Sequence, residues 1–189
     1  LKDVAEMLDN VLQYFIDNAP DTVSRAVYSA KQERSIGIGA LGFHAYLQKN
    51  SIPFEGFMAK STNIRMFKLI RGKLDEANME LGKERGEAID ARGTGRRFSH
   101  VMAIAPTATI ANIAGVSPCI EPYYKLLFVK ANLSGDFTIY NPYLVESLKK
   151  INLWDDPNHA EKKNELIQMI GSFRVRSGYQ TRKLWEKAR

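Results

Sequence analysis

The stretch from Val101 to Gly115 constrains the fold of this chain more than any other part of its sequence. A short apolar run ends there at Pro106, and Thr107 and Thr109 then precede small and apolar residues at helical spacing. This pattern predicts a buried strand that passes through a tight turn into a helix whose first turn holds both threonines.

The predicted turn has two physical interpretations. The first backbone N–H groups of a helix have no partner within that helix, and the helix dipole places partial positive charge beside them. Small side chains allow an anion to approach these groups closely, so the turn is a candidate phosphate-binding site. The alternative is that Thr107 is an ordinary N-cap of a core helix. The local sequence leaves both interpretations open.

Length and composition are those of a globular protein with one domain. The chain has 189 residues, of which 44% are hydrophobic and 25% are charged, which allows a sizeable core and is too apolar for a disordered chain. Its net charge of +6 suits phosphorylated metabolites or nucleic acid and does not discriminate between them. No apolar run reaches the roughly 18 residues of a membrane span, and no signal region precedes the first helix. We therefore expect an intracellular, cytoplasmic chain without a membrane partner.

The single cysteine, Cys119, excludes an internal disulfide and a metal site of the CxxC type. His44 and His100 lack cysteine or carboxylate partners at ligand spacing, so we expect no metal site. We interpret Cys119 as a small, buried apolar residue. The chain starts without methionine, and a helical pattern is already under way at Leu1, which indicates a piece of a longer polypeptide.

Hydrophobic periodicity predicts a mostly helical α/β organisation. Apolar residues spaced along Val4–Phe15 predict a first helix, and a polar connector follows it as far as Arg34. The other expected elements are a helix over His44–Lys49, a longer helix capped by Ser61 that runs to Leu81, a charged loop over Lys83–Arg97, a non-helical link over Ser117–Pro122, strands over Leu126–Val129 and Phe137–Tyr140, and a helix that begins at Asn141 and Pro142.

Two further signals have ordinary explanations. The glycines of Gly37–Gly42 match the GxGxxG pattern of dinucleotide-binding proteins, but no strand directly precedes them and no acidic ribose ligand follows at the required distance. We expect these glycines to allow close packing of backbone against backbone. Arg96 and Arg97 could steer a phosphate, but a solvated loop is the more common place for such a pair.

Several motifs in order along the chain resemble the large (α) subunit of class I ribonucleotide reductase. They are RSIGIGALGF at Arg34–Phe43, GEA at Gly86–Ala88 with GTGRR at Gly93–Arg97, AIAPTATI at Ala103–Ile110, SPCIEP at Ser117–Pro122 and FVKANLSGDF at Phe128–Phe137. Several motifs that agree in order are more specific than any one of them. The resemblance favours the phosphate-binding interpretation of the turn.

The resemblance implies a helix-rich α/β fold that is the later half of a ten-stranded β/α barrel, incomplete in this chain. In the family, a turn of this kind holds the diphosphate of the substrate through backbone N–H groups and hydroxyls. By direct match, the phosphate-binding residues here are Pro106, Thr107, Ala108, Thr109 and Ile110.

The enzyme implied by the resemblance is a ribonucleoside-diphosphate reductase. This oxidoreductase is an allosteric, nucleotide-binding enzyme that makes deoxyribonucleotides for DNA synthesis by thiyl-radical chemistry. In the family's order, the reactive thiols precede the position of Leu1. We therefore expect no catalytic residue on this chain and no turnover by the chain alone.

The resemblance also implies the partners of the whole enzyme. They are a ribonucleoside diphosphate substrate, a second large subunit, a small subunit whose metal centre generates the radical, nucleotide effectors (ATP, dATP and other dNTPs) and a thiol reductant. We expect this segment itself to bind no cofactor, metal or nucleic acid. We divide it into residues 1–155, a second-half portion of the barrel domain, and residues 156–189, a divergent basic C-terminal segment.

Three alternatives differ from this interpretation. A cobalamin-dependent ribonucleotide reductase would share the barrel but not the small subunit. A stand-alone phosphate- or nucleotide-binding module would bind the same anion without turnover. A structural helical domain would use the turn only as a helix cap.

Overall fold

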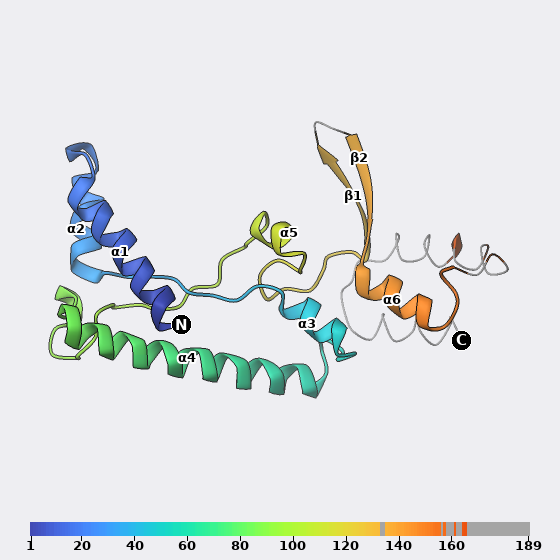
Figure 1. Cartoon of the computed structure of the whole chain (residues 1–189), viewed down its shortest axis with the longest axis horizontal. Coiled ribbons are helices and arrows are strands. Elements are labelled where there is room, and N and C mark those ends of the chain that lie inside the picture. Colours follow the sequence, from blue (N-terminus) through green and yellow to red (C-terminus); the bar gives the residue numbers. More distant parts are fainter. Residues whose placement is uncertain (133–134, 156, 158–160, 162–163, 166–189) are drawn as a thin grey trace. The chain divides into compact units, whose positions relative to one another are not determined.

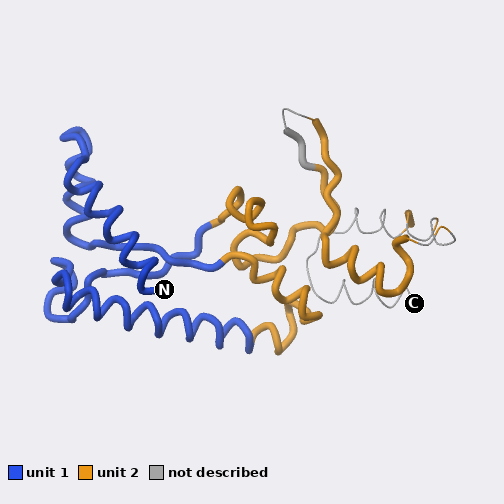
Figure 2. Tube along the Cα trace, viewed as in Figure 1, with its two compact units in different colours: residues 1–40, 61–105 blue, residues 41–60, 106–189 orange. Residues whose placement is uncertain are grey.

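The structure is a computed structural model that describes residues 1–132, 135–155, 157, 161 and 164–165. These residues form a helix-rich mixed α/β structure. The chain divides into two compact units, which we describe separately (Figure 2). Unit 1 comprises Leu1–Ala40 and Ser61–Ala105, and unit 2 comprises Leu41–Lys60 and Pro106–Arg189. Most of the C-terminal segment over residues 156–189 lies outside the described residues.

Unit 1 begins with two helices (Figure 1). The predicted first helix is confirmed as α1 (Lys2–Asn18). The prediction of a polar connector after it is wrong, because that stretch forms a 3₁₀ turn, η1 (Asp21–Val23), and helix α2 (Ser24–Glu33). Alanine, lysine, glutamine and glutamate favour a helix, but Val27 and Tyr28 are the only large apolar residues of α2, which is too few for a periodic pattern that would predict it.

The long helix α4 (Phe57–Arg85) extends beyond its predicted bounds at both ends. Ser61 is not its N-cap, because the chain already turns where the Gly56 N–H donates to the Pro53 carbonyl. The helix also includes the first residues of the predicted charged loop, which starts instead at Gly86 with a φ of +86°. A 3₁₀ turn, η2 (Ile89–Ala91), lies within that loop.

The strand predicted before Pro106 is, among the described residues, only an extended stretch of unit 1 that runs parallel to a second extended stretch. Ile38 and Met102 form a parallel bridge, and the Ile36 N–H donates to the His100 carbonyl at 3.0 Å. This is the only parallel pairing among the described residues. The structure therefore has the expected mixed α/β class, and a ten-stranded barrel goes beyond what these residues contain.

The glycines of the GxGxxG pattern allow the close packing that we predicted. A Cβ atom added to Gly37 would lie 2.9 Å from the Ala103 Cβ, and one added to Gly39 would overlap the Ala103 carbonyl oxygen. The prediction of a buried strand that ends at Pro106 is only partly right, because the stretch forms a single bridge at Met102, and Val101 is 3% exposed whereas Ile104 is 46% exposed.

The core of unit 1 lies where α1 and α4 pack with these extended stretches. Its buried members are Ala5, Ile38, Leu74, Ala77, Leu81, Phe98 and Val101. Asn78 of α4 fixes the second stretch, because its side chain accepts from the Phe98 N–H at 2.8 Å and donates to the Phe98 carbonyl at 3.1 Å.

Unit 2 holds the remaining elements. They are α3 (Phe43–Lys49), α5 (Ile110–Ala114), the antiparallel strands β1 (Leu127–Asn132) and β2 (Gly135–Tyr140), and α6 (Pro142–Lys150). The predicted helix at His44–Lys49, both predicted strands and the non-helical link over Ser117–Pro122 are confirmed. The predicted cap of α6 is also confirmed, since the Asn141 side chain accepts from the Leu144 N–H at 3.0 Å.

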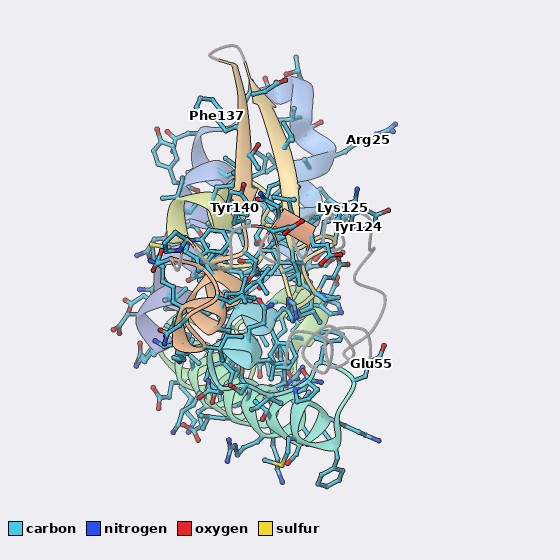
Figure 3. The ribbon with its side chains drawn as sticks, turned by 90° about the vertical axis from the view of Figure 1, so that its right-hand side faces the viewer. Arg25, Glu55, Tyr124, Lys125, Phe137 and Tyr140 are labelled. Carbon is cyan, nitrogen blue, oxygen red and sulfur yellow. The ribbon has the colours of Figure 1, made fainter. Side chains whose placement is uncertain are left out.

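The hairpin of β1 and β2 carries exposed aromatic side chains. Phe137, near the start of β2, is 50% exposed, and Tyr140 at the end of β2 is 37% exposed; Figure 3 labels both side chains. The Tyr140 ring also meets the Trp154 ring edge to face at 5.4 Å. A small cluster around Leu148 and Leu153 lies beside it. Among the described residues, each helix is too short or too polar to cross a membrane.

Candidate functional site

The turn over Pro106–Ile110 differs in detail from its prediction. Helix α5 starts at Ile110 and has only five residues, so Thr107 and Thr109 precede the helix instead of occupying its first turn. Thr107 has a φ of +45°, in the left-handed region that a β-branched residue rarely adopts. Its carbonyl accepts from the Ala111 N–H at 2.9 Å, which links the turn to the helix.

The backbone of the turn presents unused donors. Within the described part of the chain, the N–H groups of Thr107, Ala108, Thr109 and Ile110 donate to no acceptor. Thr107 is half-buried and the other three residues are exposed. Because no carbonyl of the described residues accepts from these N–H groups, they remain available to water or a ligand.

The threonine hydroxyls have different roles. The Thr109 side chain does not cap α5, although Thr109 occupies the N-cap position. The Thr107 Oγ1 accepts from the Cys119 N–H at 2.7 Å. A hydroxyl that accepts in this way still has its own hydrogen to donate. Thr107 is therefore an oriented donor, and it is not the N-cap that the alternative interpretation required.

Cys119 belongs to a segment that packs beside Thr107. The prediction that Cys119 is buried is confirmed at 7% exposed. Its φ of +51° also lies in the left-handed region, which the sequence did not predict. The backbone of Cys119, not its thiol, makes the contact with Thr107.

Ser117 joins the same segment to the start of α3. Its hydroxyl oxygen accepts from the Ala45 N–H at 3.1 Å, and its carbonyl accepts from the Gly42 N–H at 2.8 Å. Gly42 lies at the N-cap position of α3 with a φ of +81° and provides no side-chain cap. Ser117, which is fully buried, caps this helix from 72 residues away in sequence. The sequence marked Ser117 only as the first residue of the SPCIEP motif and gave no sign of this capping role.

His44 makes the second contact between α3 and this segment. Its Nδ1 accepts from the Tyr123 N–H at 3.0 Å, and its ring lies edge to face with the rings of Phe54 and Tyr123. Burial lowers the pKa of His44 to about 4, so the imidazole is neutral near pH 7 and Nδ1 is free to accept. The contacts of His44 in this structure are therefore structural.

Arg97 is part of a buried ionic cluster in unit 1, which we call the Asp9 cluster. Asp9, at 1% exposed, accepts from the side chains of Arg34, Arg85 and Arg97, with Arg97 Nε at 3.1 Å from both carboxylate oxygens. The prediction of a solvated Arg96–Arg97 pair is therefore wrong for Arg97 and right for Arg96, which is exposed. The partners lie up to 88 residues apart, so no local pattern identifies them.

The groups at the turn are suited to holding an anion. Backbone N–H groups and a hydroxyl donate hydrogen bonds, and donors that converge on a charged acceptor form stronger bonds than neutral pairs do.

His100 is exposed, and its Nδ1 lies 3.2 Å from the Ser35 hydroxyl. Within the described ranges, no group of three His, Cys, Asp or Glu side chains could hold a metal ion.

Comparison with known proteins identifies one family. The model of the ribonucleotide reductase barrel domain matches residues 1–93 and 88–177. Ribonucleoside-diphosphate reductase large subunits from Invertebrate iridescent virus 3 and Invertebrate iridescent virus 6 are each 52% identical, over 149 and 151 residues. The α subunit from Chlamydia trachomatis serovar D is 35% identical over 211 aligned positions. These matches support the reductase interpretation and give no support to a stand-alone module or a cobalamin-dependent enzyme.

A solved structure has the same fold. The α subunit of the Actinobacillus ureae class Id ribonucleotide reductase matches with a TM-score of 0.75 and 32% identity over 90% of this chain. The match covers 31% of that subunit. The two viral alignments cover 78% and 79% of this chain but only 24% and 16% of the viral proteins. The chain therefore spans a minor part of the length of its relatives.

Proposed function

The chain belongs to the ribonucleotide reductase family, whose barrel domain it matches over most of its length, and on that premise we propose that its Pro106–Ile110 turn binds the diphosphate of a ribonucleotide substrate. The observation that carries this proposal is the row of unused N–H groups from Thr107 to Ile110. An anion there would gain several hydrogen bonds at once, and small side chains leave it room to approach.

The proposed role is binding and orientation. The donors at the turn can hold phosphate oxygens but cannot break a bond of the ribose. A fixed diphosphate would orient the ribose toward reactive groups elsewhere in the subunit, which accelerates a reaction without taking part in it. The proposed phosphate-binding residues are Pro106, Thr107, Ala108, Thr109 and Ile110.

We propose the remaining properties for the whole protein of which this chain would be a part. That protein would be a cytoplasmic ribonucleoside-diphosphate reductase large subunit that converts ribonucleotides to deoxyribonucleotides by thiyl-radical chemistry. It would form a homodimer, respond to ATP, dATP and other dNTP effectors, and work with a thiol reductant and a small subunit whose metal centre supplies the radical. Residues 1–155 would form part of the wall of a ten-stranded barrel, and residues 156–189 would be a separate basic segment.

The proposal is tested by removing both hydroxyls of the turn in the full-length subunit. Thr107→Val with Thr109→Val removes two hydrogen-bond donors and keeps the side-chain shape. We expect the KM for CDP to rise by about tenfold or more and kcat to change much less, because a binding interaction common to ground state and transition state would be lost.

The matched control is Thr138→Val on β2, an exposed position in a strand where a β-branched residue is well tolerated. It should leave both constants unchanged. A double variant with the KM of the unmodified subunit would contradict the assignment of the turn to the phosphate.

A further inference from the structure

The segment over Ser117–Tyr123 is fixed to α3 at both of its ends. At one end Ser117 accepts from the N–H groups of Gly42 and Ala45, through its carbonyl and its hydroxyl. At the other end the Tyr123 N–H donates to His44 Nδ1 at 3.0 Å. These bonds lie within unit 2, and both side chains that make them are buried. A segment held at two points has little freedom to move in between.

The middle of this segment meets the turn. Cys119 lies between the two anchors, and its N–H donates to Thr107 Oγ1 at 2.7 Å. The contact holds the oxygen of the Thr107 side chain in one position. It also uses one acceptor site of the hydroxyl, so that the hydroxyl hydrogen can point only away from Cys119.

Thr107 needs such support more than most residues do. A β-branched residue with a φ of +45° is strained, and strained residues keep their conformation only where surrounding contacts determine it. The Ala111 N–H holds the Thr107 carbonyl, and the Cys119 N–H holds its side chain. Loss of the second contact would free the Thr107 side chain to rotate.

We propose that Ser117 is a positioning residue for phosphate binding: it places the Cys119 N–H on Thr107 Oγ1 and thereby directs the Thr107 hydroxyl toward the ligand. His44 is the second anchor of the same segment, and it also helps to hold the Cys119 N–H against Thr107 Oγ1. This inference rests on the proposed function of the turn, and it adds to that proposal two residues that do not touch the phosphate.

A double-mutant cycle in the full-length large subunit, assayed with its small subunit and CDP, tests the inference. Ser117→Ala should raise the KM for CDP about fivefold and change kcat by less than about twofold, because only the direction of one donor is lost. In a Thr107→Val background, Ser117→Ala should change KM by less than about 1.5-fold, because the hydroxyl that it directs is already absent.

The outcomes separate this inference from the function on which it rests. If Thr107→Val raises KM but Ser117→Ala has the same effect in both backgrounds, Ser117 does not act through Thr107 and the positioning role is wrong. If Thr107→Val alone leaves KM unchanged, the Thr107 hydroxyl does not bind the ligand and the positioning role is wrong, whereas an unchanged KM in the double variant Thr107→Val with Thr109→Val would overturn the phosphate assignment itself. Ser99→Ala is the matched control, since the Ser99 hydroxyl is buried without a partner among the described residues, and it should change neither constant.

His44 provides a second test that does not depend on the stability of a Ser117 variant. His44→Leu removes the acceptor for the Tyr123 N–H, whereas His44→Asn places an amide oxygen close to the position of Nδ1. We expect His44→Leu to raise the KM for CDP and His44→Asn to restore most of the affinity. Equal effects of the two variants on KM would overturn the role of this anchor, because packing alone would then explain the loss.

Discussion

Asp9 shows how one residue can hold distant parts of a unit together. Burial alone would raise the pKa of Asp9, but hydrogen bonds from Arg34, Arg97 and Arg85 outweigh this effect and hold its pKa below the ordinary value. The three guanidinium groups belong to the end of α2, the end of α4 and the loop after it. A single carboxylate on α1 thus joins three segments, and Arg85 also pairs with Glu6 of the same helix.

Asp9→Asn should destabilise unit 1 strongly. Removal of one partner from a buried ionic cluster costs about 3–5 kcal/mol, because Arg34 and Arg97 would stay largely buried without the carboxylate that they pair with. Hydrogen exchange of the α1 amides in the full-length subunit measures the loss. Asp3→Asn on the exposed face of the same helix is the control, and it should cost less than about 1 kcal/mol, the size of a helix-dipole effect.

The lowered pKa of Asp9 also predicts how the stability lost in Asp9→Asn depends on pH. Because the folded-state pKa of Asp9 is lowered, its stabilising contribution is complete above the unfolded-state pKa of about 4 and is lost as pH falls through the lower folded-state pKa. The difference in stability between the unmodified subunit and Asp9→Asn should therefore be constant from pH 7 to 5 and shrink below about pH 4. A difference that stayed constant through the acid range would show that the Asp9 charge is not its source.

At the scale of elements, helix α4 contains two glycines with opposite expected roles. A Cβ atom added to Gly82 would overlap the carbonyl oxygen of Gly95, so the loop packs directly on the helix backbone there. Gly72 has no atom within 4 Å of such a Cβ. The loop is fixed in turn by Glu87, whose carboxylate accepts from the N–H groups of Gly93, at 2.7 Å, and of Gly95.

Alanine substitutions should therefore shift stability in opposite directions. Gly72→Ala should stabilise the subunit by about 0.5–1 kcal/mol, the helix-propensity difference at an open position. Gly82→Ala should destabilise it by about 1–3 kcal/mol, because backbone atoms must move to accept the methyl group. The melting temperatures of the two full-length variants provide the comparison, and each variant is the control of the other. A Gly82→Ala subunit that melts at or above the temperature of Gly72→Ala would disprove the close approach of helix and loop.

At the scale of the whole molecule, the sequence predicted elements better than it predicted contacts. Periodic apolar residues located α1 and most of α4, and Asn141 with Pro142 located the start of α6, because those signals are local. Helix α2 was missed because its ten residues include only two large apolar side chains, Val27 and Tyr28, too few to show a periodic pattern. The contacts of Arg97 with Asp9 and of Ser117 with Ala45 depend on partners that only the folded chain brings together.

For the candidate site, the sequence indicated the position of the turn but not its backbone conformation or the residues that support it. Motif order located the Pro106–Ile110 turn, and Pro106 with the following threonines indicated its strand-to-helix corner. The left-handed conformations of Thr107 and Cys119 could not be predicted, because threonine and cysteine rarely adopt them and neighbouring segments impose them here. Ser117 and His44 carried no signal of their own, since a capping hydroxyl and a neutral imidazole acceptor become recognisable only beside the N–H groups that they meet.

The division between binding and chemistry leads to a prediction for the chain as a whole. The chemistry proposed for the whole protein is a thiyl-radical reaction, whereas this chain contains one cysteine, which is buried with its backbone engaged at the turn. The 189-residue chain should therefore convert no CDP to dCDP with dithiothreitol and the small subunit, measured by product chromatography. The full-length subunit under the same conditions is the positive control. Formation of dCDP by the chain alone would mean that it carries reactive groups of its own, and the assignment of this segment to substrate binding alone would have to be abandoned.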